Sequence, residues 1–249
     1  PHPRSGFQTL MNPQPLPLAL ADVLARGDVW RGDTLASLAQ ETIPSGHPEL
    51  DAELPGGGWP RGSLTEILVD RSGVGEMSLL LPALARLSAE GGWLALVAPP
   101  CLPYAPAWAA AGLALERLVI IKASRRIGWC VEQLLTCGGF AGVLACPEAS
   151  IDGRALRRLQ VAAEGRSAFT CLWRPREAGG SPSPAPLRLA LAAGDSSLSV
   201  RIIKRRGRPV SRLLALSVSR PLSGRNSRAV AGPELSLVAA RGLAAAALA

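Results

Sequence analysis

The middle of the chain alternates short β-rich apolar segments with longer segments of helical apolar spacing. Residues 64–69 and 93–97 have the composition of strands, and residues 75–89 between them place apolar side chains at helical intervals. Strands that alternate with helices predict an α/β fold with a mostly parallel sheet flanked by helices. Further strands are expected at 118–121, 141–145 and 168–173, and further helices at 127–137 and 151–165.

From residue 178 onward the predicted strands are no longer separated by helices. Residues 178–186 are rich in Gly, Ser and Pro and predict a loop, after which three apolar segments at 187–191, 198–203 and 212–218 are expected to form antiparallel strands that complete the sheet. We therefore expect a mixed sheet within one core domain. The expected domains are an N-terminal arm at 1–42 with a short helix at 18–26, a core at 43–218 and a disordered basic, Ala-rich tail at 219–249.

Composition and charge narrow the classes of function. The 249 residues are 48% hydrophobic, which is enough for one sizeable core, and no apolar run approaches the roughly 20 residues that span a bilayer. We expect a cytoplasmic protein without membrane contact. The net charge of +8 is uneven, because residues 1–150 carry 10 Lys and Arg against 14 Asp and Glu, while residues 151–249 carry 17 against 5. The basic half is the candidate contact surface.

The sequence offers few residues that could carry out catalysis or bind a metal ion. The five cysteines are scattered without a C-x-x-C pair, and the two histidines, His2 and His47, have no partners in the sequence that suggest a metal site or a nucleophile–base pair. We therefore expect no cofactor, no metal, no small-molecule substrate and no enzyme activity.

A degenerate phosphate loop follows the first long strand. A functional loop has the pattern G-x-x-x-x-G-K-[ST], in which backbone N–H groups and the Lys hold phosphates and the hydroxyl holds the metal ion. Here Asp70 stands for the first Gly, Glu76 for the Lys and Met77 for the Ser or Thr, and only Gly75 is kept. Two carboxylates at a triphosphate site repel it by several kcal/mol, so we expect no nucleotide.

A purely structural interpretation of this loop is also open. Gly73 and Gly75 can form a strand-to-helix turn, and Glu76 then stabilises the helix N-terminus through the helix dipole.

The stretch before the loop resembles the corresponding stretch of RecA-family recombinases, with an S-G, an L-D and a G-G-x-P-x-G turn within residues 43–62. This resemblance implies a RecA-like fold. It places the family's catalytic Glu near Pro99–Cys101 and its Walker B Asp near Cys146–Glu148, where no matching residue is found apart from the slightly displaced Glu148.

Longer matches identify a closer family. The runs PGGGWPRGSLTEILVDRSGVGEMSLLLP at 55–82, APPCLPYAP at 98–106 and KRRG at 204–207 are similar to ImuA proteins of translesion DNA synthesis, and the likeness extends over roughly residues 29–218. The resemblance implies a non-catalytic SOS protein that works with ImuB and an error-prone DnaE-type polymerase and contacts RecA. SulA-type inhibitors of cell division, which bind FtsZ, share the middle of the pattern and are the alternative. An unorthodox ATPase that uses Glu148 is a third hypothesis.

The basic half contains a dense cationic segment. Gly207 and Pro209 predict a turn between two strands, and the segment could bind DNA phosphates or an acidic partner. Because no aromatic residue is interleaved, any DNA binding there is expected to be non-specific and salt-dependent. The alternative is a solvated hairpin whose charges oppose edge-to-edge aggregation. The candidate residues are Arg201, Lys204, Arg205, Arg206, Arg208 and Arg212.

Overall fold

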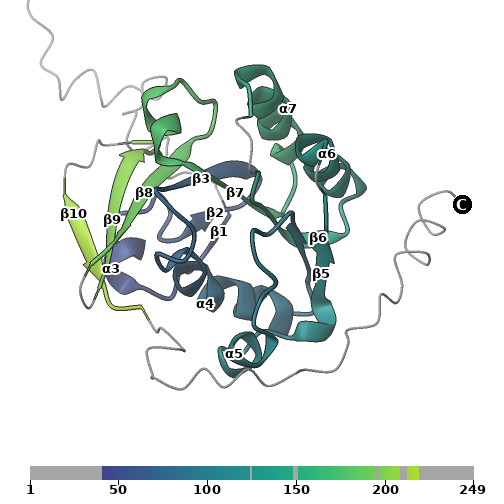
Figure 1. Ribbon diagram of the computed structural model, residues 1–249, viewed down its shortest axis with the longest axis horizontal. Helices are drawn as coiled ribbons and strands as arrows, with labels where there is room; N and C mark the ends of the chain where they lie inside the picture. Colours follow the sequence, from purple (N-terminus) through teal and green to yellow (C-terminus); the bar gives the residue numbers. More distant parts are fainter. Residues whose placement is uncertain (1–40, 124, 148–150, 195–196, 208–211, 219–249) are drawn as a thin grey trace, which may run out of the picture.

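In the computed structural model, an eight-stranded mixed sheet runs through the described residues, which are 41–123, 125–147, 151–194, 197–207 and 212–218 (Figure 1). The strand order is β10-β9-β8-β3-β7-β6-β4-β5, parallel from β8 to β5 and antiparallel at β8-β9 and β9-β10. The expected α/β class with a mostly parallel sheet is confirmed. The strands are β3 (Ser63–Val69), β4 (Trp93–Val97), β5 (Leu118–Ile121), β6 (Phe140–Ala145), β7 (Phe169–Pro175), β8 (Leu187–Ala193), β9 (Leu198–Lys204) and β10 (Leu213–Leu216).

Helices cover both faces of this sheet (Figure 1). Side chains of α3, α4 and α5 join one hydrophobic cluster, and those of α6 and α7 join a second cluster on the opposite face. Each long helix lies where apolar spacing predicts one. The helices are α3 (Pro48–Asp51), α4 (Glu76–Ala89), α5 (Ala105–Ala110), α6 (Ile127–Cys137) and α7 (Gly153–Ala163), with 3-10 turns η1 (Leu115–Arg117) and η2 (Arg176–Gly180).

The strand β3 lies at the centre of the sheet, between β7 and β8. All seven of its residues are buried, because parallel strands covered on both faces expose neither side. Successive side chains point to opposite faces, so that Ile67 packs in the cluster of α4 while Leu64 packs in the cluster of α6 and α7. The polar residues of β3 are therefore buried as well.

The strand β8 joins the parallel part of the sheet to the antiparallel part. The expected antiparallel strands at the end of the sheet are confirmed, because β8 is antiparallel to β9 and β9 to β10, while β8 runs parallel to β3 on its other side. The chain crosses from β7 past β3 through η2 and the following loop, and it therefore enters β8 in the direction of β3 and β7. The change of strand direction falls at the β8-β9 connection.

The glycine-rich stretch before β3 makes a turn beside a two-stranded sheet of β1 (Thr42–Ile43) and β2 (Trp59–Pro60), which the sequence pattern did not predict. Gly56, Gly57 and Gly62 have positive φ. Gly58 does not, and its small size serves a different purpose: a Cβ there would lie 2.3 Å from the carbonyl oxygen of Ile43.

Most of the expected arm and all of the expected tail lie outside the described residues. This applies to residues 1–40, with the helix expected at 18–26, and to residues 219–249. Within the described ranges, the secondary structure begins at Thr42 and ends at Leu216.

Candidate functional site

The degenerate phosphate loop connects β3 to α4, as its place in the sequence predicts. Gly73 and Gly75 both have positive φ, and Gly75 precedes the first residue of α4. Their backbone N–H groups point at the carboxylate of Glu76: Gly73 donates to Oε1 at 2.7 Å and Gly75 donates to Oε2 at 3.0 Å. The loop is therefore a backbone anion nest whose anion is a side chain of the same loop.

The position of Glu76 is electrostatically favourable. The residue is 9% exposed, stands in the first turn of α4 and accepts two backbone hydrogen bonds, so that the positive end of the helix dipole compensates its charge. A phosphate group would need the same N–H groups. The geometry fits the structural interpretation of the loop, with the added feature that Glu76 binds both glycine N–H groups.

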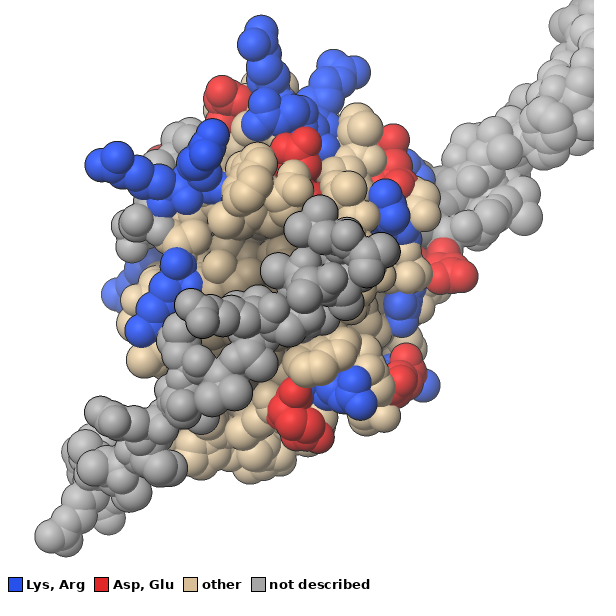
Figure 2. Space-filling view, turned by 90° about the vertical axis from the view of Figure 1, so that its right-hand side faces the viewer, with Lys and Arg blue, Asp and Glu red and all other residues tan. Residues whose placement is uncertain are grey.

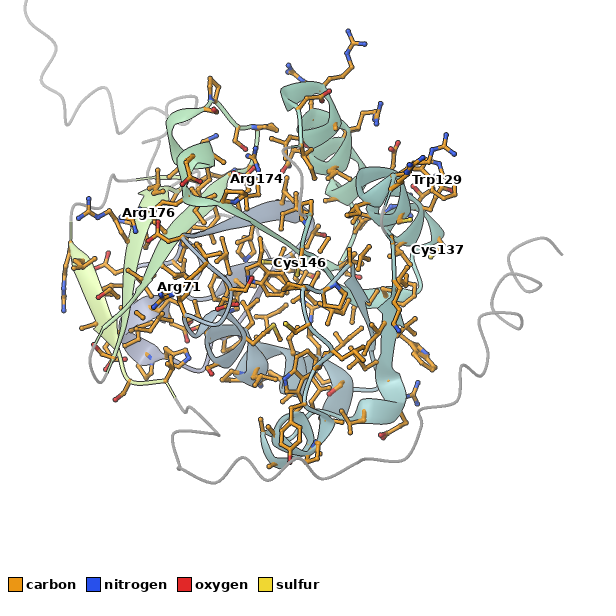
Figure 3. The ribbon with its side chains drawn as sticks, in the orientation of Figure 1. Arg71, Trp129, Cys137, Cys146, Arg174 and Arg176 are labelled. Atoms are coloured by element: carbon orange, nitrogen blue, oxygen red, sulfur yellow. The ribbon has the colours of Figure 1, made fainter. Side chains whose placement is uncertain are left out.

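The remaining loop residues differ in exposure. Asp70 is exposed and forms an ion pair with Arg176 of η2, with 3.0 Å between Oδ2 and Nη1. Met77, which stands for the Ser or Thr of the P-loop pattern, is partly buried and packs against the core. Arg71 is exposed on the same loop (Figure 3).

The two positions that the RecA resemblance marks as catalytic lie after β4 and β6. Pro99, Pro100 and Cys101 follow β4 and bring no carboxylate. Cys146 follows β6 and packs against the core, and burial together with the negative charge of Glu76 raises the pKa of its thiol to about 12 (Figure 3). Such a thiol stays protonated and unreactive near neutral pH. Glu148 lies outside the described residues.

A buried charged cluster on β3 is the most marked feature that sequence reasoning missed. Glu66 is fully buried, and its Oε1 lies 3.0 Å from Nη1 of Arg174 on β7 while its Oε2 lies 2.7 Å from Nε of Arg188 on β8. Ser183 donates a further hydrogen bond of 2.8 Å to Oε1. Two arginines thus share one carboxylate in the interior.

The surplus positive charge of this cluster is directed at backbone carbonyls. Arg188 donates to the carbonyl oxygens of Ala178, Gly179 and Ser181, and Arg174 donates to that of Ile151. Arg188 therefore holds η2 and the loop after it against the sheet. In this way the cluster positions the segment that carries Arg176, the partner of Asp70.

The sequence contained one signal for this cluster. Glu66, Arg174 and Arg188 are each single charged residues within apolar strands, and a charge in a fully buried strand must be paired. Which charges pair depends on strand order, and the pairing of β3 with both β7 and β8 cannot be read from local pattern.

Two residues of the cationic segment contact other parts of the chain. Lys204 donates to the carbonyl oxygen of Ser183 at 2.8 Å, and Arg205 contacts both the backbone oxygen and the carboxylate of Glu53. Arg205 is partly buried, whereas Arg201, Lys204, Arg206 and Arg212 are exposed. Arg208 lies outside the described residues.

These contacts attach the start of the cationic segment to other parts of the chain. Lys204 and Arg205 each bind another segment of the chain, so they help to fasten β9 to the loop after η2 and to the end of α3. Whether the segment binds DNA or an acidic partner stays a prediction.

The tryptophans differ in their burial. Trp59, Trp108 and Trp173 are buried in the core, and Trp93 is partly buried beneath the guanidinium of Arg117. Trp129 on α6 is different, because it is 51% exposed and projects outward from the helix (Figure 3).

Two further observations concern metals and membranes. Among the described residues, His, Cys, Asp and Glu form no group of three that could hold a metal ion. In the same ranges no helix has the length and apolar character needed to cross a bilayer.

The chain was compared with known protein families and curated proteins. The model of the MT3502 N-terminal domain matches residues 52–176, which include the loop, β3 and the helices α4 to α7. No curated protein matches the chain in sequence.

Proposed function

The chain belongs to the MT3502 N-terminal domain family, and we propose that it is a non-catalytic accessory protein of SOS-induced translesion DNA synthesis. In this role it is an adaptor of the DNA-damage response, located in the cytoplasm. It joins ImuB and an error-prone DnaE-type polymerase in a mutagenic repair complex and contacts RecA. These partners follow from the resemblance of residues 29–218 to ImuA proteins.

One observation supports the absence of catalysis above all others. The carboxylate of Glu76 accepts the N–H groups of Gly73 and Gly75, which are the groups that a phosphate would need. A triphosphate entering this loop must displace the carboxylate and then lie beside it and beside Asp70. The loop is thus suited to hold the start of α4 in place and poorly suited to hold ATP.

The positions after β4 and β6 support the same proposal. Hydrolysis of ATP requires a group that orients the attacking water and a carboxylate that holds the metal ion. Cys101 and the protonated thiol of Cys146 supply neither function.

Nucleotide binding is the first test. The full chain is titrated with Mg-ATP up to millimolar concentration by calorimetry, next to the variant Glu76→Gln, which removes the negative charge and keeps the shape. We expect no binding by the wild-type chain. Saturable ATP binding or ATP turnover by the wild-type chain would contradict the non-catalytic role.

Partner capture is the second test. The tagged full chain is recovered from damage-treated host cells and its partners are identified by mass spectrometry. A variant with Lys204, Arg205, Arg206 and Arg208 changed to Ala is captured in parallel, because these residues belong to the cationic segment. Recovery of ImuB, RecA or the error-prone polymerase is the expected result. Recovery of FtsZ alone would replace the proposal with a division inhibitor.

A further inference from the structure

A second cationic surface lies on α6, α7 and the loop before α6, far along the sheet from β9 and β10. Residues 122–158 carry six Lys and Arg against three Asp and Glu. Figure 2 shows Lys and Arg side chains gathered on the upper part of this side of the molecule. We call this surface the α6-α7 face; its cations, all exposed, are Lys122, Arg125, Arg126, Arg154, Arg157 and Arg158.

The two helices present these cations side by side. α6 connects β5 to β6 and α7 connects β6 to β7, and because these strands are parallel the two helices run in the same direction. Their N-termini therefore lie at the same edge of the sheet, which brings Arg126 and Arg154 to the same level. An ion pair of 3.5 Å between Arg158 and Glu132 joins the helices.

Of the three acidic residues, Glu148 lies outside the described residues, and the two that the structure describes, Glu132 and Asp152, are already engaged. Glu132 pairs with Arg158, and Asp152 caps α7 by accepting the N–H of Ala155 at 2.6 Å. Within the described ranges, neither Arg154 nor Arg157 forms an ion pair, and the same holds for the three cations before α6. The α6-α7 face thus has an excess of positive charge that is free to meet an anionic partner.

An exposed aromatic ring stands among these cations. Trp129 is 51% exposed, and the guanidinium of Arg126 lies 5.8 Å from the centroid of its ring. Tryptophan is enriched at binding interfaces, and single-stranded bases stack on aromatic rings that lie among cations. Among the described tryptophans Trp129 is the most exposed, while those in the core are fixed by packing.

We infer that the α6-α7 face binds single-stranded nucleic acid. Its arginines contact consecutive phosphates, and Trp129 stacks on one base. An acidic protein segment would match the charge but would leave the ring of Trp129 without a stacking partner, so single-stranded nucleic acid fits both observations better. The inference deepens the proposed adaptor role, on which its biological meaning rests.

The test uses the purified full chain and a fluorescently labelled oligothymidine, with binding followed by anisotropy at several salt concentrations. The variant Arg154→Ala/Arg157→Ala removes two cations from α7, and Arg71→Ala/Arg86→Ala is the matched control, since it removes two exposed cations from the loop after β3 and from α4. Trp129→Ala and Trp129→Phe test stacking. Thermal unfolding of each variant verifies that it is folded.

We expect the α7 double variant to lower affinity at least about tenfold and to reduce the slope of log affinity against log salt by about 1.4, or about 0.7 for each lost phosphate contact. The matched control should retain wild-type affinity. Trp129→Ala should weaken binding about fivefold to a hundredfold, and Trp129→Phe should recover most of the loss because a phenyl ring also stacks.

Several results would overturn the inference. These are unchanged binding by the α7 double variant, an equal loss in the matched control, a preference for duplex over single strand, or binding of polyglutamate without binding of oligothymidine. The proposed function fails separately: capture of ImuB, RecA or polymerase from cells without oligonucleotide binding overturns only this inference, whereas oligonucleotide binding without such partners overturns only the adaptor role.

Discussion

Glu66 on β3 and Arg188 on β8 are direct neighbours in the register of two parallel strands, and their side chains meet at 2.7 Å in the interior. Arg174 on β7, on the other side of β3, binds the second oxygen of the same carboxylate. The three central strands are therefore linked across the sheet by charge as well as by backbone hydrogen bonds. Because the cluster is buried, its integrity should influence the stability of the whole domain.

The variant Glu66→Gln should be strongly destabilised. It keeps the size of the side chain but leaves two buried guanidinium groups without a counter-charge, at a cost of about 3–5 kcal/mol in the free energy of unfolding. Urea denaturation followed by circular dichroism measures this change. As a control, Glu90→Gln breaks an exposed ion pair with Arg86 and should cost about 0.5 kcal/mol or less. Similar losses in both variants would contradict the importance of the cluster.

Substitutions of Arg174 and Arg176, which are two residues apart, should differ widely in their effect on the free energy of unfolding. Arg174→Ala removes a buried partner of Glu66 and should cost about 3–5 kcal/mol, whereas Arg176→Ala removes an exposed partner of Asp70 and should cost about 1 kcal/mol or less. The chemical change is the same in both variants, so the difference in urea midpoint reports burial. Equal midpoints would mean that the buried pair adds no more than a surface pair.

Alkaline pH should destabilise the protein through Cys146. Its pKa is raised to about 12 in the folded state by burial and by Glu76, while an unfolded thiol ionises near pH 9. The unfolded chain therefore releases this proton first, and the contribution of Cys146 to stability is complete below pH 9 and falls by about 1.4 kcal/mol per pH unit between pH 9 and 12. Cys146→Ala should flatten the pH dependence by this amount, as measured by the urea midpoint across that range. An unchanged slope would show that the thiol ionises as easily in the folded state.

The turn before β3 offers a matched pair of glycines. Gly57 and Gly62 both have positive φ, but a Cβ at Gly57 would meet no atom within 4 Å, while one at Gly62 would lie 2.6 Å from the carbonyl oxygen of Arg166. Gly57→Ala should cost about 1–2 kcal/mol through backbone strain alone. Gly62→Ala should cost about 1–3 kcal/mol more, because the backbone of Arg166 must move. Thermal denaturation of the two variants compares them, and equal melting temperatures would rule out this close approach.

The sequence predicted single helices and strands better than it predicted which distant strands pair. Apolar periodicity placed α6 at its observed bounds and β3, β4 and β5 within one residue, because these signals are local. The two-stranded sheet of β1 and β2 was missed, since each strand has only two residues and depends on a contact across the glycine turn. The antiparallel pairing of β8 with β9 was predicted, but its parallel pairing with β3 is set by the crossover past β3, which no local pattern records.

The candidate site was predicted in part. The position and composition of the degenerate loop were evident from Asp70, Glu76 and Met77, but the contact of Glu76 with two N–H groups requires the folded turn. Likewise, the charge of the C-terminal segment was evident, whereas the fastening of Arg205 to Glu53 joins residues 152 positions apart. Properties of single segments can be read from sequence, and properties of pairs of segments come from topology.

The carboxylate of Glu76 belongs to the same chain as the two N–H groups that it binds. Its effective concentration at these groups is therefore independent of the concentration of nucleotides in the cell. A loop that holds bound ATP changes state as ATP is used and replaced. On the proposed function, this loop does not follow the ratio of ATP to ADP, and the shape of the adaptor is the same in a starved cell as in a growing one. Control of its action then rests with how much of it is made and which partners are present.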